Sequence, residues 1–330
     1  MQLAMTRRQA MTGLAMSAQL AVSAARAAGS SLPATPKLCV AGPAGGLADR
    51  WAAVIAEPMG TALHDAGAPP LPYENIGGAD GVTGANQYQA RAVPDGTMAL
   101  LLPGAALRAW LVGDTRVRFD IGTLAPLWGV TTQAVVATRA RLEPGRAVRV
   151  AVSGIDGPGL EALLALELMG IEAIPVIGGR PDEVDAVYLR GAAARDPLSA
   201  PGFAPAFSLG GRPGREPAFP DLPQAADLFA PALAANREAV DMFQAVSAAA
   251  SIEVTLVLPA VVPAAVLAWW RHGCAQMDDA PAVRAAAASA AVRQNDAGQI
   301  ATQLASVALD MPAMLALRVH LVERYHWRPS

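Results

Sequence analysis

The sequence has few charged residues and no strong excess of either sign. Asp, Glu, Lys and Arg make up 16% of its 330 residues, and the net charge is −3 at pH 7. The arginines are scattered along the chain, so no basic surface for nucleic acid is indicated. We therefore expect no nucleic-acid partner.

Residue patterns that carry metal or nucleophilic chemistry are also missing. The four histidines occur singly, without the spacing of a metal site. Ser153 lacks the flanking glycines of a nucleophile elbow, and no lysine follows a glycine loop as it does in a P-loop. We therefore expect no metal, no cofactor and no enzymatic activity.

Cysteine is limited to Cys39 and Cys274, which lie far apart in the sequence. Cys39 falls within an apolar run that reads as a strand, where a cysteine behaves as a small buried hydrophobe. Export to an oxidising compartment would allow the two to pair. We favour two buried thiols.

No apolar run fits a membrane-spanning helix. The longest, Val254–Trp270, contains Pro259 and Pro263, which suit a strand followed by the start of a helix. The same stretch holds Trp269 and Trp270, which we interpret as packing residues.

The N-terminus has the features of a cleaved export signal. Arg7 and Arg8 precede an apolar stretch over residues 10–25, and small residues follow near Ala27 and Ala28. The paired arginines permit the twin-arginine route as well as the general one. We expect residues 1–27 to be removed, so that the mature chain works outside the cytoplasm.

Two glycine-rich turns stand out in the first third of the chain. They are GPAGGLAD (42–49) and GGADGVTG (77–84), and they alternate with apolar runs at 37–41, 71–75 and 97–103. This order predicts parallel strands linked by helices, with both turns at the same edge of the sheet. Helix N-termini at such an edge offer N–H groups to small anions.

A similar unit follows in the second third. We expect a strand at 149–153, a helix at 158–169 and a strand at 171–177, because the apolar residues recur at those periods. The turn between the first two, SGIDGPGL, again combines glycines with a proline suited to a first helical turn. From Pro263 onward the chain reads as largely helical as far as Trp327.

These motifs resemble, in order, those of the Bug-type periplasmic substrate-binding proteins of tripartite tricarboxylate transporters. The similar segments are AGG with Asp49 (44–49), YEN (73–75), the glycine run 78–84, PDG (94–96), VSG (152–154), PAFPDLP (217–223) and LPA (258–260). The resemblance covers nearly all of the mature chain. Each motif is weak alone, and their shared order carries the assignment.

The resemblance implies a type II periplasmic-binding-protein fold of α/β class, with two lobes, a hinge and an interlobe cleft. It divides the chain into lobe 1 (28–136), lobe 2 (137–253) and a return to lobe 1 with C-terminal helices (254–330). It further implies a monomer in the periplasm that captures a small organic acid and delivers it to membrane permease subunits. The ligand-binding positions it implies are Ala44, Gly45, Gly46, Gly78, Ala79, Asp80, Ser153, Gly154, Asp156 and Gly157.

The sequence also departs from the family in ways that bear on the ligand. Between Pro175 and Asp185 the chain is too short for the third ligand-facing turn and helix. Asp80 and Asp156 stand inside the glycine loops, where each either caps its helix, which we favour, or faces the ligand and selects an ammonium group.

Other interpretations stay open. A sensor or scaffold of the same fold, binding an amino-acid-like ligand, fits the same motifs. A Rossmann-like nucleotide-binding enzyme fits less well, because Gly42, Gly45 and Gly46 do not form G-x-G-x-x-G. Residues 131–133 near the expected hinge suit either a ligand contact or an exposed turn, and Trp110 is a further pocket candidate.

Overall fold

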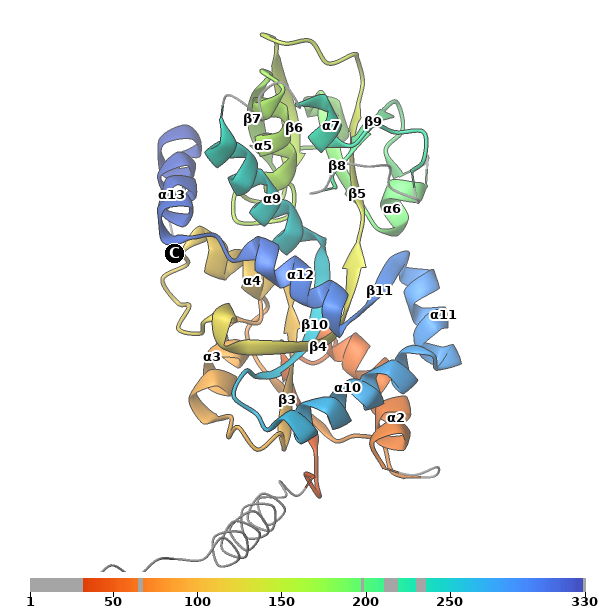
Figure 1. The fold of residues 1–330 in the computed structure, drawn as a ribbon. Coiled ribbons are helices and arrows are strands. Elements are labelled where there is room, and N and C mark those ends of the chain that lie inside the picture. Colours follow the sequence, from red (N-terminus) through yellow and green to blue (C-terminus); the bar gives the residue numbers. More distant parts are fainter. Residues whose placement is uncertain (1–31, 65–67, 197–198, 211–218, 230–235, 329–330) are drawn as a thin grey trace, which may run out of the picture.

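The computed structural model describes residues 32–64, 68–196, 199–210, 219–229 and 236–328, so the export signal expected at 1–27 lies outside the described residues. Two separate sheets with helices on their faces form two lobes, one above the other in Figure 1. This is the two-lobed α/β fold that the sequence predicts.

The sheet of lobe 1 has six strands in the order β11-β4-β10-β3-β1-β2. They are β1 (Lys37–Ala41), β2 (Tyr73–Ile76), β3 (Met98–Pro103), β4 (Leu124–Thr132), β10 (Ile252–Pro259) and β11 (Val292–Asp296). Strands β2, β1 and β3 are parallel, as the glycine-loop spacing predicts, and β10 is antiparallel to β3 and β4. The carboxyl ends of β1, β2 and β3 therefore meet at one edge.

The sheet of lobe 2 has five strands in the order β7-β6-β8-β5-β9. They are β5 (Ala134–Thr138), β6 (Ala147–Val152), β7 (Glu172–Ile177), β8 (Ala186–Arg190) and β9 (Ala204–Ser208). Strands β7, β6 and β8 are parallel, whereas β5 is antiparallel to β8 and β9. Lobe 2 thus also gathers three strand ends at one edge.

Helices cover both sheets. They are α2 (Leu47–Leu63), α3 (Val82–Arg91), α4 (Gly104–Val112), α5 (Leu160–Leu168), α6 (Ala192–Arg195), α7 (Ala225–Leu228), α9 (Arg237–Ser251), α10 (Ala264–Asp278), α11 (Pro281–Ala290), α12 (Ala297–Val307) and α13 (Met311–Tyr325). Short 3-10 turns lie at Ile121–Thr123 and Pro181–Glu183. Figure 1 shows α9 running down from lobe 2 to the start of β10.

Strand β3 illustrates how the core is built. Its side chains alternate between the two faces of the sheet, so Leu100 and Leu102 enter one hydrophobic core and Leu101 enters another. The core that contains Leu101 is closed by α2 and α10, and it includes the fully buried Trp270. The core that contains Leu100 extends into lobe 2 as far as Leu163 and Phe207.

The chain crosses between the lobes where strands change sheets. Strand β4 of lobe 1 continues into β5 of lobe 2 with only Gln133 between them. The return occurs at Ile252, where α9 ends and β10 begins. Residues 131 and 132 therefore belong to a buried strand and not to an exposed turn.

Strand β11 interrupts the C-terminal part, which the sequence predicts to be largely helical. Ala291, with a positive φ of 54°, ends α11 and turns the chain into an edge strand antiparallel to β4. The buried Asn295 of this strand donates from Nδ2 to Thr131 Oγ1 at 2.9 Å. Its polar sequence, VRQND, gives no strand signal, because pairing with β4 determines its conformation.

Both cysteines are buried and unpaired, as predicted. Burial raises the pKa of the Cys39 thiol to about 12, and burial also raises that of Cys274. Both side chains thus remain protonated and act as apolar packing groups.

Among the described helices, no single one has the length and apolar character of a membrane span. The pair α12 and α13, bent by 63°, meets those criteria only when taken together.

Candidate functional site

The first glycine loop joins β1 to α2 at the carboxyl end of β1. Gly42 donates its N–H to Ile76 O at 3.0 Å, which ties this loop to the end of β2. Gly46 is the N-cap of α2 and donates to Pro43 O at 3.0 Å. Gly45 has a φ of 76°, a conformation that favours glycine.

The backbone of Gly45 already has partners within the chain. Its N–H donates to Asp49 Oδ2 at 2.6 Å, and its carbonyl accepts from Arg50 Nη1 at 2.9 Å. Asp49 lies in the first turn of α2, where its charge is favoured by the helix dipole. A ligand that uses the Gly45 N–H must therefore displace Asp49.

The second glycine loop lies directly beside the first. Gly81, the N-cap of α3, has a φ of 82° and packs against Pro103 and the carbonyl of Ala41. Gly78, with a φ of 94°, accepts at its carbonyl from Gly81 N at 3.1 Å. The structure thus brings positions 44–46 and 78–80 to one edge of lobe 1.

The carboxylate of Asp80 is occupied at the start of α3. One oxygen accepts from Val82 N at 3.1 Å, and the other pairs with Arg116. This is close to the capping role favoured for Asp80, although Gly81 itself is the N-cap residue. Both carboxylate oxygens of Asp80 therefore have partners, although Arg116 also pairs with Asp114, so the three side chains together keep one negative charge.

The lobe 2 loop follows β6 and leads into α5. Ser153 Oγ donates to Pro158 O at 3.3 Å, and Gly157 N donates to Gly154 O at 3.2 Å. Both Ser153 and Asp156 are exposed. The loop thus forms a compact turn at the lobe 2 strand edge.

The capping role favoured for Asp156 is wrong. Helix α5 begins at Leu160, two residues later than predicted, and its N-cap is Gly159, which receives no side-chain cap. The Gly159 N–H is instead taken by Glu161 Oε2 at 3.2 Å. Asp156 lies too far before the helix to cap it.

The segment between Pro175 and Asp185 is short, as the sequence indicates. Strand β7 ends at Ile177, Gly178 donates to Val152 O at 3.0 Å, and a single 3-10 turn leads to β8. Arg180 N donates to Glu183 Oε2 at 3.1 Å and Glu183 N donates to Arg180 O at 3.0 Å, which closes that turn. No longer helix stands in this described segment.

A buried polar cluster at the boundary between the lobes was not predicted. It consists of Arg108 on α4, Glu161 on α5, Tyr188 and Arg190 on β8, and Glu253 on β10. Arg190 Nη2 donates to Glu253 Oε1 at 2.8 Å and to Ala250 O at 3.2 Å. The one feature of the sequence that could have indicated this cluster is a lone arginine within the apolar run of α4.

Burial dominates the electrostatics of this cluster. Arg108 is 9% exposed and Glu161 2%. Burial lowers the pKa of Arg108 against the attraction of Glu161, and burial raises the pKa of Glu161. Both shifts disfavour the charged forms, which is the expected effect of removing ionic groups from water.

Other candidate residues have structural partners. Trp270 Nε1 donates to Gly96 O at 2.9 Å and Trp269 Nε1 to Leu63 O at 3.2 Å, so both are packing residues, as predicted. Trp110 is partly buried against the hydrophobic core on α4. Within the described residues, no group of histidine, cysteine or acidic side chains is arranged to hold a metal ion.

A surface cavity of about 560 Å³ lies on the outer face of the lobe 2 sheet, lined by residues such as Leu189, Phe203 and Phe219. Leu189 points to the face opposite Tyr188 and Arg190, because side chains alternate along a strand. The positions predicted to contact ligand do not line this cavity.

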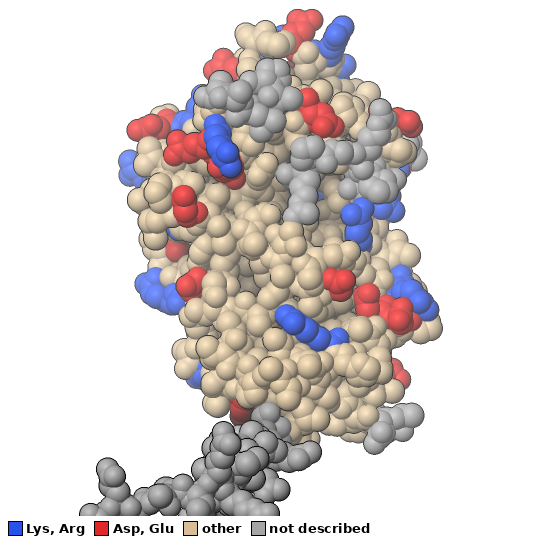
Figure 2. Space-filling model, in the orientation of Figure 1, with Lys and Arg blue, Asp and Glu red and all other residues tan. Residues whose placement is uncertain are grey.

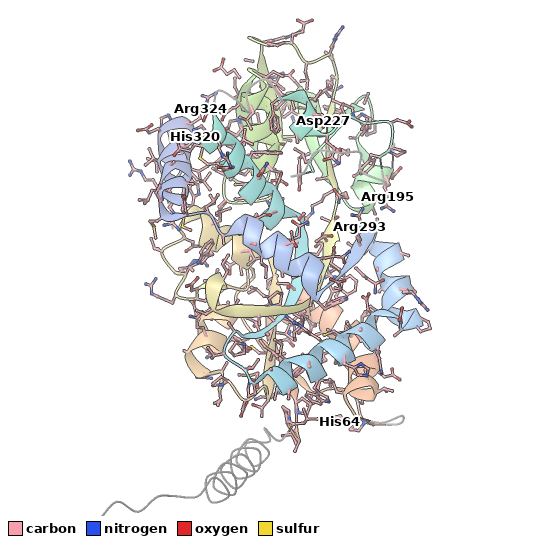
Figure 3. The ribbon with its side chains drawn as sticks, in the orientation of Figure 1. His64, Arg195, Asp227, Arg293, His320 and Arg324 are labelled. Carbon is pink, nitrogen blue, oxygen red and sulfur yellow. The ribbon has the colours of Figure 1, made fainter. Side chains whose placement is uncertain are left out.

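The charge on the surface is mixed. Figure 2 shows acidic and basic side chains interspersed over the visible face of both lobes, in agreement with the low net charge. Figure 3 places Arg195 of lobe 2 and Arg293 of lobe 1 on the same side of the molecule, near the boundary between the lobes.

Two α/β lobes joined by crossing strands, with loops at the carboxyl ends of parallel strands, define the class of periplasmic binding folds. No family model and no curated protein matches the sequence. Solved structures do match the fold. A TctC solute-binding protein from Polaromonas has a TM-score of 0.63 at 16% identity, covering 89% of this chain and 100% of that one.

Two further structures agree. MatC from Rhodopseudomonas palustris, solved with bound malate, has a TM-score of 0.53 at 16% identity, covering 89% of this chain and 99% of its own. The periplasmic binding protein BugD has a TM-score of 0.51 at 19% identity, covering 88% and 97%. These likenesses confirm the predicted fold.

Proposed function

We propose that the chain is an extracytoplasmic solute-binding protein of the Bug type, which captures a small organic acid for a tripartite tricarboxylate-type transporter. The observation that supports this most is the pair of adjacent glycine loops at one strand edge of lobe 1, in a fold shared with TctC and MatC. The export signal expected at 1–27 supports a location in the periplasm. Membrane permease subunits are the expected partners of the protein.

The mechanism is binding without chemistry, carried out by a monomer. Backbone N–H groups and helix N-termini at the lobe edges favour an anionic solute, and closure of the lobes excludes water from it. Binding without chemistry is supported by the solved structures that share the fold, because TctC is described as a solute-binding protein and BugD as a periplasmic binding protein.

The test is a thermal-shift and calorimetric titration with malate. At about 100 times its dissociation constant, a true ligand should add about 2.7 kcal/mol to the free energy of unfolding. NMR of the recovered solute should show it unchanged. Turnover of the solute, or no stabilisation by malate or related dicarboxylates, would contradict the proposal.

A second experiment distinguishes a simple acid from an amino-acid-like solute. Asp156 is exposed and does not cap α5, so it is the acidic loop residue able to face an ammonium group. For an acid binder, Asp156→Asn should leave malate affinity level or raise it, because a negative charge is removed. Asp80→Asn is the control, since both oxygens of Asp80 already have partners, in Val82 N and in Arg116.

The alternative predicts the opposite result. If the solute carries an ammonium group, Asp156→Asn should weaken glutamate binding by about tenfold or more, corresponding to about 1.4 kcal/mol. That outcome would favour the sensor or amino-acid-binding alternative.

A further inference from the structure

The buried cluster at the lobe boundary contains polar atoms that the described chain leaves without partners. Arg108 Nε and Arg190 Nε are both buried, and neither has a hydrogen-bond partner among the described residues. Unpaired buried donors are costly and therefore call for a physical reason.

Arg108 has fewer partners than Arg190, the other arginine of this cluster. Arg190 has direct partners in Glu253 and the carbonyl of Ala250, at 2.8 and 3.2 Å. Glu161 accepts from the Gly159 N–H at the start of its own helix. Arg108 has only the through-space attraction of Glu161, Tyr188 and Glu253 to offset its burial, and Arg190 opposes that attraction. A guanidinium in this situation matches a carboxylate, which accepts two parallel hydrogen bonds from it.

The position of Arg108 connects it to the glycine loops. Helix α4 starts at Gly104, directly after Pro103, which packs against Gly81 of the second loop. Arg108 therefore lies about one helical turn behind the loop edge. On the lobe 2 side, Tyr188 and Arg190 share the sheet face that points toward it, because they are two residues apart on β8.

We infer that Arg108, together with Arg190, forms an anion site at the lobe boundary that holds one carboxylate of the solute. This inference rests on the proposed function and names the solute class as a dicarboxylate, with one end at the loops and the other at Arg108. The residues come from both lobes, so the site is complete only when the lobes are together. Burial raises the pKa of Glu161, which disfavours the negative charge that would otherwise balance Arg108.

The test compares Arg108→Met and Arg108→Lys with wild type in malate titrations. Loss of the guanidinium fork should weaken binding by about 10- to 100-fold in both variants, because losing a hydrogen bond to a charged group lowers the affinity by about that factor. Arg149→Met is the matched control, because Arg149 is an exposed lobe 2 arginine paired with Asp185, and its loss should leave the affinity unchanged. Unchanged malate affinity in both Arg108 variants would overturn the inference while leaving the proposed function standing.

A second readout needs no solute. If Arg108 is kept for a ligand, Arg108→Met should leave the melting temperature of the solute-free protein unchanged or raise it, because an unpaired buried charge is removed. A marked fall would mean that Arg108 is a structural partner of Glu161, and would overturn the inference. Should malate and other dicarboxylates fail to bind the wild type, the proposed function fails, and this comparison still decides the role of Arg108.

Discussion

Gly45 shows how a single residue sets the conformation of the first loop. Its φ of 76° lies in the left-handed region, and a Cβ built there would meet nothing within 4 Å. The glycine is therefore required by the backbone and not by lack of space. Its N–H bond to Asp49 depends on that conformation.

Replacing Gly45 by alanine should lower the free energy of unfolding by about 1–2 kcal/mol, the cost of a left-handed L-residue. Gly77→Ala is the control, because Gly77 lies in the neighbouring loop with equal open space and no positive φ. Urea denaturation measures both. Equal small losses in the two variants would show that the first loop relaxes and that φ is not fixed at Gly45.

Residues were predictable from sequence only where the local chain determines their role. The glycines of both loops follow from turn chemistry, and both cysteines from their apolar surroundings. The role of Arg108 could not be predicted, because its neighbours Glu161, Tyr188 and Arg190 are brought to it by the packing of two lobes. Asp156 was wrongly predicted to cap, because the exact first residue of α5 is set by Gly159, which has a φ of 106°.

At the scale of elements, α13 contacts both lobes. Glu167 on α5 of lobe 2 accepts from His320 Nε2 at 3.0 Å, Arg324 Nε at 3.0 Å and Tyr325 Oη at 2.7 Å. Figure 3 shows His320 and Arg324 on α13 beside lobe 2. Toward lobe 1, Arg318 donates to the carbonyls of Trp110 and Leu111 at the end of α4.

Glu167→Gln should weaken the docking of α13 and lower the free energy of unfolding by about 1–3 kcal/mol at pH 7. Burial raises the pKa of Glu167, but hydrogen bonds from His320, Tyr325 and Arg324 outweigh it and hold the pKa below the ordinary 4.5. A depressed carboxylate pKa stabilises the fold above its unfolded value, and this contribution is lost as the pH falls through the folded value.

The difference between wild type and Glu167→Gln should therefore be full at pH 7 and shrink below a pH of about 4.5. Denaturant titrations at several pH values measure it. Glu172→Gln is the control, since Glu172 meets the same Arg324 at 3.8 Å but is 59% exposed, and it should cost less than about 1 kcal/mol. A pH-independent difference would rule out the carboxylate as the cause.

Elements with strong local patterns were predicted well. The strand at Lys37–Ala41 has the predicted bounds, and those at β3, β6 and β7 differ by one or two residues. Strand β11 was missed because its stability comes from pairing with β4, which lies far away in sequence.

For the whole molecule, the order of motifs predicted two lobes but not how their edges meet. That meeting depends on crossings at Gln133 and Ile252 and on contacts such as Gly191, at the end of β8. A Cβ on Gly191 would lie 3.2 Å from Thr132 Oγ1 and 3.3 Å from Ala290 O, both of lobe 1. The absence of a side chain therefore allows the lobes to approach here.

Gly191→Ala should force Thr132 and Ala290 of lobe 1 to shift by a few tenths of an ångström, and Gly202→Ala provides its control. Both glycines have positive φ, 58° and 81°, so each alanine should cost about 1–2 kcal/mol of folding stability. A Cβ on Gly202 would meet only Arg139, at 3.2 Å within lobe 2. Calorimetry should therefore show weaker malate binding for Gly191→Ala alone, because the lobes close less fully on the solute. Equal affinities for the two variants would mean that Gly191 sets the conformation of its own turn and not the approach of the lobes.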